Sequence, residues 1–170
     1  MGETLTGRET GNIPGLDAAE QRSWQSFLDA ALLVYASVNR GLVDTHHLTL
    51  NDVRILDLIA RSDSGSARMG DLADELMSLP SRVTRQIHRL EKQGYVRRSS
   101  SPDDGRGVLA SITEEGRAAL TAAMSTYGDG VRKFFVGRLS RAQVGAVGDS
   151  CRRVGQSLRS DPSPARLGRV

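Results

Sequence analysis

Basic and hydroxyl side chains gather on one face of a helix predicted within the stretch from Leu79 to Arg106. Val83, Ile87 and Leu90 are spaced by four and three residues and form a narrow apolar stripe that such a helix buries. The opposite face and its flanks carry these polar side chains: Ser81, Arg82, Thr84, Arg85, His88, Arg89 and Lys92. Guanidinium and ammonium groups beside short hydroxyls bind anions, so this face is expected to dock on a polyanion.

The segments on either side of this helix predict a winged helix-turn-helix. A short amphipathic helix and a turn at Met77–Leu79 precede it, and Pro80 is tolerated in its first turn. Two strands are predicted after it, at Val96–Ser100 and Val108–Ile112, joined by the turn sequence SPDDGRG. This fold places its second helix in a major groove while the hairpin reaches to the side. We therefore expect a mainly α-helical protein with a small β-hairpin wing that binds double-stranded DNA.

The distribution of charge supports an anionic partner. The net charge is only +3, yet residues 82–106 carry seven basic and three acidic side chains, whereas residues 1–81 carry six basic and twelve acidic ones. Aromatic residues make up 4% of the chain, too few for a protein that stacks the bases of single strands. The single cysteine excludes an internal disulfide and a zinc finger, and no apolar run is long enough to span a membrane. A cytoplasmic protein without a cofactor is expected.

Long amphipathic helices are predicted near both ends of the chain. Apolar residues recur in steps of four and three from Trp24 to Leu42 and again from Val144 to Leu158, a spacing typical of helices that pack on other helices. A Gly-Asp-Gly sequence at 128–130 predicts a kink in the helix that follows the hairpin. Earlier in the chain, the polar run from Arg61 to Ala67 predicts a flexible loop.

Three residues predict helix N-caps. Thr49 is followed three residues later by Asp52, a capping-box partner, and Thr113 and Ser140 are expected to cap the two helices after the hairpin.

The stretch from Gly70 to Leu120 resembles the MarR family of bacterial transcriptional regulators. It contains GDLADEL, SRVTRQIHRLEKQGYVRR and SPDDGRGVLASITEEGRAAL in that order, similar to the family's Leu-Ala helix, V-T-R recognition helix, L-E-K-x-G-[LY]-V, wing with Asp-x-Arg, and L-T-x-x-G. The resemblance covers residues 20–158. It implies a homodimer, joined through its first and last helices, that reads a pseudo-palindromic operator. A repressor relieved by a small-molecule effector is the expected role.

The resemblance also implies roles for single residues. The residues expected to reach base edges or nearby phosphates stand at the start of the recognition helix: Ser81, Arg82, Thr84 and Arg85. The residues expected to neutralise phosphates without reading sequence are Arg89, Lys92, Arg97 and Arg98. His88 is expected to be a polar contact on the DNA side. Arg106 aligns with the wing-tip arginine that enters the minor groove, and Asp104 with the acid that orients it.

The expected organisation has five parts. They are a disordered tail (1–16), an N-terminal dimerisation helix (17–45), a winged helix-turn-helix domain (46–113), C-terminal dimerisation helices (114–158) and a flexible tail (159–170). Trp24, Tyr35 and Tyr127 could line a pocket for a small aromatic or phenolic effector, although aromatic residues at helical spacing are more often core.

Several alternatives are weighed against this interpretation. The main one is a winged helix that binds protein or shapes DNA without effector control. His46 and His47 could join a metal site, but neither cysteine nor helical spacing supports one, so loop histidines are favoured. Cys151 lies on an apolar seam and is expected to be a small core residue rather than a redox sensor. An enzyme is disfavoured because no phosphate loop, nucleophile motif or carboxylate pair beside a histidine is present.

Overall fold

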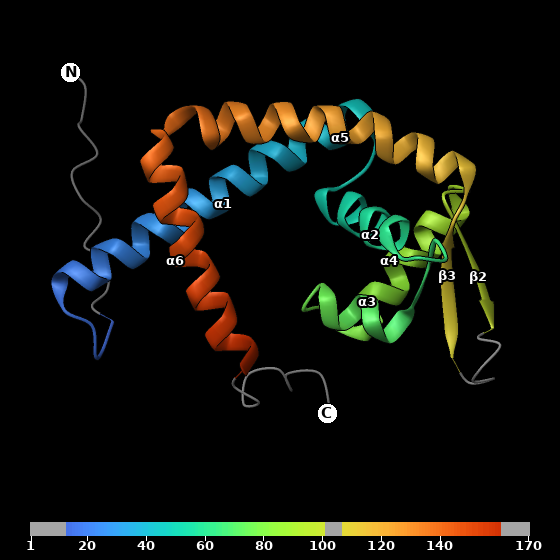
Figure 1. Cartoon of the computed structure of the whole chain (residues 1–170), viewed down its shortest axis with the longest axis horizontal. Coiled ribbons are helices and arrows are strands. Elements are labelled where there is room, and N and C mark those ends of the chain that lie inside the picture. The colour runs from blue at the N-terminus through green and yellow to red at the C-terminus, as the bar shows by residue number, and fades with distance from the viewer. Residues whose placement is uncertain (1–12, 101–106, 161–170) are drawn as a thin grey trace, which may run out of the picture.

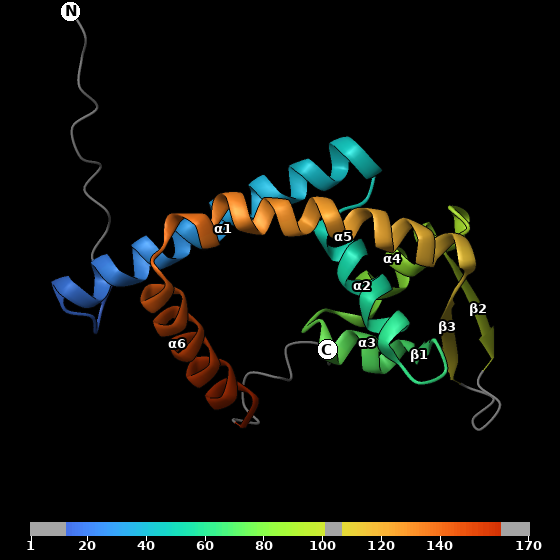
Figure 2. The same cartoon turned by 45° about the horizontal axis from the view of Figure 1, so that its top comes forward.

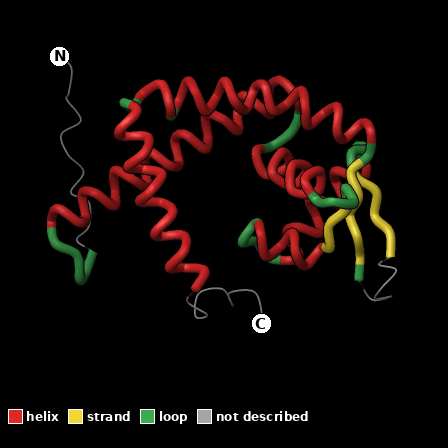
Figure 3. Tube along the Cα trace, in the orientation of Figure 1, coloured by secondary structure: helices red, strands yellow, loops and turns green. Residues whose placement is uncertain are grey.

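The computed structural model describes residues 13–100 and 107–160. Within these ranges helices dominate, and a small sheet lies at one end (Figures 1 and 3). Two long helices, α1 (Ala18–His46) and α5 (Glu114–Phe134), pack side by side, and helices α2 to α4 form a lobe with the sheet below one end of α5 (Figure 2). The predicted fold class, mainly α-helical with a hairpin wing, is confirmed.

A capping box fixes the start of α1. Asp17 accepts hydrogen bonds from the backbone N–H groups of Ala19 and Glu20, and the Glu20 carboxylate accepts one from the backbone N–H of Asp17. These bonds satisfy donors that have no partner inside the first turn of a helix. The helix ends at His46, because the next residue, His47, has a left-handed backbone (φ 56°) that stops the helical run.

The lobe contains the following elements in chain order: α2 (Leu50–Arg61), β1 (Ser66–Arg68), α3 (Met69–Glu75), α4 (Pro80–Lys92), β2 (Val96–Ser100) and β3 (Val108–Ile112). Thr49 caps α2 and exchanges hydrogen bonds with Asp52, as the sequence predicts. Pro80 is the first residue of α4, where the N–H that proline lacks would have no helical partner anyway. The helix-turn-helix and both hairpin strands lie where they were predicted.

The sheet is antiparallel, with strand order β1-β3-β2. The prediction of a flexible loop up to Ala67 is wrong at its end, because Ser66–Arg68 pair with β3 as strand β1. The Ser66 and Ser111 hydroxyls lie 2.7 Å apart across this pair. Three residues, Ser-Ala-Arg, are too few to show a periodicity of their own, so the partner strand specifies β1.

The recognition helix is anchored by the predicted apolar stripe. Val83, Ile87 and Leu90 are fully buried and belong to the single core that α2, α3 and β3 also line. The alternation of Val108, Ala110 and Ile112 along β3 predicts that all three point inward. Ala110 is buried, but the prediction is wrong for Val108, which is 42% exposed. Val108 opens the strand, at the end of the hairpin that lies farthest from the core.

Thr113 caps α5, as predicted, by accepting a hydrogen bond from the backbone N–H of Gly116. The Gly-Asp-Gly sequence at 128–130 does not interrupt this helix, which continues to Phe134. A Cβ atom built on Gly130 would lie 3.4 Å from Cγ2 of Val38 on α1. Because this is an ordinary van der Waals distance, the packing of α5 on α1 does not depend on the missing Cβ of Gly130.

The C-terminal segment stands apart from the lobe (Figures 1 and 2). A short 3-10 helix, η1 (Val136–Arg138), leads into α6 (Arg141–Ser160), which buries none of its residues. Ser140 and Gln143 cap α6 reciprocally, as predicted for Ser140. Cys151 is exposed in the single chain, so the prediction that it is a small core residue is wrong.

The prediction that His46 lies in a loop is wrong, because His46 is the last residue of α1. Its Nε2 atom lies 2.8 Å from the Thr126 hydroxyl on α5, which ties the end of α1 to its neighbour. Within residues 13–100 and 107–160, no group of three His, Cys, Asp or Glu side chains is arranged to hold a metal ion. In the same ranges no helix has the length and apolar character needed to cross a membrane.

Candidate nucleic-acid interface

The outer face of α4 carries exposed polar and basic side chains, as the sequence predicts. Its exposed residues of this kind are Ser81, Arg82, Thr84, Arg85, His88 and Lys92. An open groove of about 390 Å³ runs along this face and is lined by Arg82, Arg85, Gln86, His88, Arg89 and Lys92. The apolar stripe on the opposite side holds the helix on the core, so the basic face is presented outward on a rigid element.

Three cations on this face are available to a ligand. No acidic side chain in the described part of the chain forms an ion pair with Arg82, Arg85 or Lys92. Arg97, on β2, is exposed and has no acidic partner among the described residues either. Unpaired guanidinium and ammonium groups on one surface are the arrangement that attracts a polyanion.

The Thr84 hydroxyl is partly committed within the helix. It donates a hydrogen bond to the backbone carbonyl of Pro80 at 2.8 Å, one turn earlier. In this rotamer the hydroxyl oxygen can still accept a hydrogen bond but cannot donate one. Thr84 therefore suits a donor such as a base amino group better than a phosphate oxygen.

Arg89 was predicted to contact phosphate, but in the structure it pairs with a carboxylate of its own chain. Its guanidinium forms an ion pair with Oδ1 of Asp52, which is completely buried in α2. The second oxygen of Asp52 accepts from the backbone N–H of Thr49 at 2.7 Å. The sequence predicts only a capping role for Asp52, because no local pattern indicates that it faces α4.

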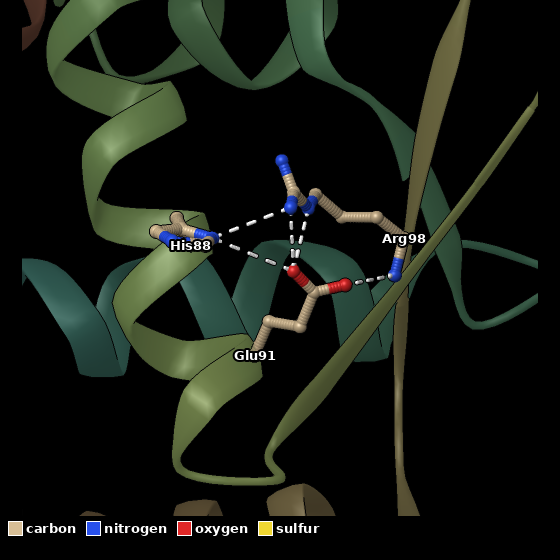
Figure 4. A network of polar contacts seen from close by, with 3 residues as sticks. All are labelled: His88, Glu91 and Arg98. Carbon is tan, nitrogen blue, oxygen red and sulfur yellow. Dashed lines mark hydrogen bonds and ion pairs between the residues drawn. The ribbon is translucent and has the colours of Figure 1, made fainter.

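Arg98 was likewise predicted to neutralise phosphate, and it too is paired. Figure 4 shows its guanidinium against the carboxylate of Glu91, with Nε and Nη2 each 2.7 Å from Oε2. Nη2 also lies 3.3 Å from Nδ1 of His88. Glu91 was missed as a functional residue, although it is the only acidic side chain between Arg82 and Arg98.

Asp104 and Arg106 lie outside the described residues, so their roles stay predictions.

Comparison with known proteins agrees with this geometry. The MarR family model matches residues 48–108, from the residues just before α2 to the start of β3. YwhA of Bacillus subtilis (strain 168), an uncharacterized HTH-type transcriptional regulator, is 34% identical over 97 residues, which cover 55% of this chain and 68% of that protein. Sco3205, a MarR family transcriptional regulator from Streptomyces coelicolor solved in complex with DNA, is 33% identical with a TM-score of 0.81. That match covers 87% of this chain and 95% of Sco3205.

The chain belongs to the MarR family. It is therefore a transcriptional regulator with a winged helix-turn-helix, and the family is one of regulators rather than enzymes. AbsC, a MarR family transcriptional regulator from Streptomyces coelicolor, superposes with a TM-score of 0.80 at 28% identity, covering 88% of this chain and all of AbsC.

The three aromatic residues expected to line an effector pocket do not form an evident site in this MarR family chain. Trp24 and Tyr35 lie on α1, are 47% and 43% exposed, and stand three turns or about 16 Å apart along the helix. The Trp24 ring contacts Phe27, with ring centroids 6.0 Å apart. Tyr127, on α5, packs against the core. The pocket stays a prediction.

Acid should weaken the pair between Glu91 and Arg98. The Arg98 side-chain hydrogen bonds hold the pKa of Glu91 below its ordinary 4.5, an effect that desolvation partly opposes. Because the pKa of Glu91 is lower in the folded protein, the ionised carboxylate stabilises the fold fully above pH 4.5. This contribution is lost as the pH falls from there through the lowered pKa. We expect the stability difference between wild type and Glu91→Gln to be largest near neutral pH and to vanish in acid. Urea unfolding of both proteins, from neutral pH down through 4.5, measures it; a pH-independent difference would contradict the ionic pairing.

Proposed function

We propose that this MarR family regulator binds double-stranded DNA sequence-specifically, with α4 in a major groove and the β2–β3 hairpin beside it. The observation that carries the proposal is a set of cations on the exposed face of α4, none of which has an acidic partner among the described residues: Arg82, Arg85 and Lys92. Arginine can donate two hydrogen bonds to O6 and N7 of a guanine, while lysine suits a phosphate. The structure of Sco3205 in complex with DNA supports the same use of this fold.

The regulator is further proposed to act as a homodimer. Large apolar side chains are exposed on the first half of α1 and along α6, where a single chain leaves them in water: Trp24, Phe27, Leu28, Leu32, Leu33, Val147, Val154 and Leu158. Large apolar side chains that a single chain leaves exposed along two helices favour a protein interface there. A twofold dimer would place two copies of α4 in successive major grooves about 34 Å apart, which calls for a pseudo-palindromic site.

A repressor role and relief by a small aromatic or phenolic molecule complete the proposal. They rest on the family resemblance, with Trp24, Tyr35 and Tyr127 as the side chains that would meet the effector. A ligand of this kind acts only through a difference in affinity between the DNA-competent and incompetent spacings of the two α4 helices.

Selection of binding sites from random duplex DNA with the purified full-length chain tests the proposed function. We expect enrichment of one palindromic consensus whose half-sites are about one helical turn apart. If no sequence is enriched, sequence-specific DNA binding is wrong and a protein-binding winged helix becomes the better interpretation. Enrichment of a single half-site without symmetry would contradict the homodimer while leaving DNA binding intact.

Arg85 and Lys92 should respond differently when each is changed to alanine. Arg85→Ala should weaken binding to the selected site by about 1–3 kcal/mol and affect scrambled DNA much less, because a base contact is lost. Lys92→Ala should weaken both complexes by a similar factor and reduce the salt dependence, because a phosphate contact carries no sequence information. Fluorescence anisotropy titrations on both duplexes at several salt concentrations separate these outcomes. Equal losses on both duplexes for Arg85→Ala would place Arg85 in the phosphate class.

A further inference from the structure

Glu91 is an unexpected residue at the end of a helix that faces a polyanion. It lies in the last turn of α4 between Arg89 and Lys92, and its side chain is 30% exposed. A carboxylate near DNA phosphates weakens binding by charge repulsion. Its presence in this position therefore calls for a role that outweighs the repulsion.

Beyond its own helix, Glu91 contacts one residue of the wing, Arg98. Its Oε2 atom accepts from Nε and Nη2 of Arg98, each at 2.7 Å, and its Oε1 atom accepts from the backbone N–H of Arg98 at 3.2 Å. Both carboxylate oxygens are thus used, one on the side chain and one on the backbone of the same residue (Figure 4). Charge-assisted bonds of this kind are stronger and better oriented than neutral ones.

The element that Glu91 contacts, β2, is an edge strand of the sheet. The strand order β1-β3-β2 leaves β2 with β3 as its only neighbour in the described sheet, so one edge of β2 has no strand beside it. The Arg98 amide donates to Glu91 of α4, whereas the ladder partner of Arg98 on β3 is Ala110. The carboxylate therefore joins the recognition helix to the edge of the wing at a fixed point.

We propose that Glu91 is a positioning residue that fixes the wing against the recognition helix through Arg98, so that α4 and the hairpin meet a DNA duplex in one geometry. Arg98 then acts by holding Glu91 and does not serve as a phosphate contact. The inference rests on the proposed DNA binding and adds a determinant of its geometry.

His88 completes the arrangement. Its Nδ1 atom lies 3.3 Å from Nη2 of Arg98 and 3.7 Å from Oε2 of Glu91, so the imidazole contacts both members of the pair. The rest of the ring is exposed on the basic face of α4. The Glu91–Arg98 pair in this way also contacts a residue of the candidate interface.

Glu91→Gln separates a positioning role from a simple charge effect, because the two predict opposite changes in DNA affinity. Removing a negative charge near phosphates should tighten binding if electrostatics alone acts. Loss of the fixed wing should instead weaken binding to the selected duplex by about tenfold, equivalent to about 1.4 kcal/mol. The matched control is Asp57→Asn, which removes an acid from the exposed Asp57–Arg61 pair on α2 and should change affinity by less than about twofold.

A charge-swapped pair tests whether the contact itself matters. Glu91→Arg alone should weaken binding despite its added positive charge, and Glu91→Arg with Arg98→Glu should recover most of that loss, which general destabilisation cannot do. Amide exchange in the free proteins follows the Arg98 N–H directly and should be faster in Glu91→Gln. Unchanged or tighter binding by Glu91→Gln, or no recovery in the swapped pair, overturns the inference. If the wild-type protein selects no DNA but exchange of the Arg98 N–H is still faster in Glu91→Gln, the proposed function is wrong, while the contact between Glu91 and the wing is supported.

Discussion

Replacing Arg89 with leucine should lower the free energy of unfolding by about 2–3 kcal/mol, measured by urea denaturation at neutral pH. Asp52 is completely buried, and its Oδ1 atom has the Arg89 guanidinium as its cationic partner. Leucine fills the apolar part of the arginine site but offers no hydrogen-bond donor. A buried carboxylate would then be left without a counter-charge, which costs more than the original pair contributed. The estimate stays modest because Arg89 is 42% exposed and water can partly replace it.

Arg85→Leu is the matched control, since it places the same substitution on the same helix at an exposed residue without an acidic partner among the described residues. It should change stability by less than about 0.5 kcal/mol. Adding Asp52→Asn to Arg89→Leu should recover part of the loss, because asparagine keeps an acceptor for the Thr49 N–H and carries no charge. If Arg89→Leu costs no more than Arg85→Leu, the pair is not structural and Arg89 returns to the group of candidate phosphate contacts.

Local patterns in the sequence were sufficient to predict most elements. The apolar steps of four and three located the helices, and cap residues such as Thr49 and Thr113 located their starts. Alternation and turn residues located both hairpin strands at their observed bounds. Strand β1 was missed because three residues, Ser-Ala-Arg, are too few to carry such a pattern, and its pairing with β3 specifies it.

The candidate site was predictable only where a residue's role depends on its own helix. The outward direction of Arg82 and Arg85 follows from the helical period once the buried stripe is known. Arg89 and Arg98 share the charge that made them candidate phosphate contacts, but their partners lie on other elements. Asp52 reaches Arg89 from α2, and Arg98 meets Glu91 after the chain has turned back into β2. Two of the four residues predicted to contact phosphate, Arg89 and Arg98, thus form ion pairs within the protein.

Gly116→Ala should destabilise the protein by about 3 kcal/mol, again by urea denaturation. A Cβ atom at Gly116 would lie 2.1 Å from the carbonyl oxygen of Tyr95 and 3.0 Å from Cγ1 of Ile112. The Tyr95 carbonyl belongs to the backbone just before β2 and already accepts from the Thr113 N–H at 3.1 Å, so it has little freedom to retreat. The first turn of α5 would have to move away from the start of the wing.

Gly128→Ala, in the same helix, is the control that isolates this contact. Nothing lies within 4 Å of a Cβ atom at Gly128, so alanine there should stabilise α5 by up to about 1 kcal/mol through its higher helix propensity. If the two substitutions change the free energy of unfolding in opposite directions, Gly116 is needed for a close approach between α5 and the wing rather than for backbone flexibility. Equal effects would remove that explanation. Because Tyr95 links α4 to β2, the same approach helps to set where the wing starts relative to the recognition helix.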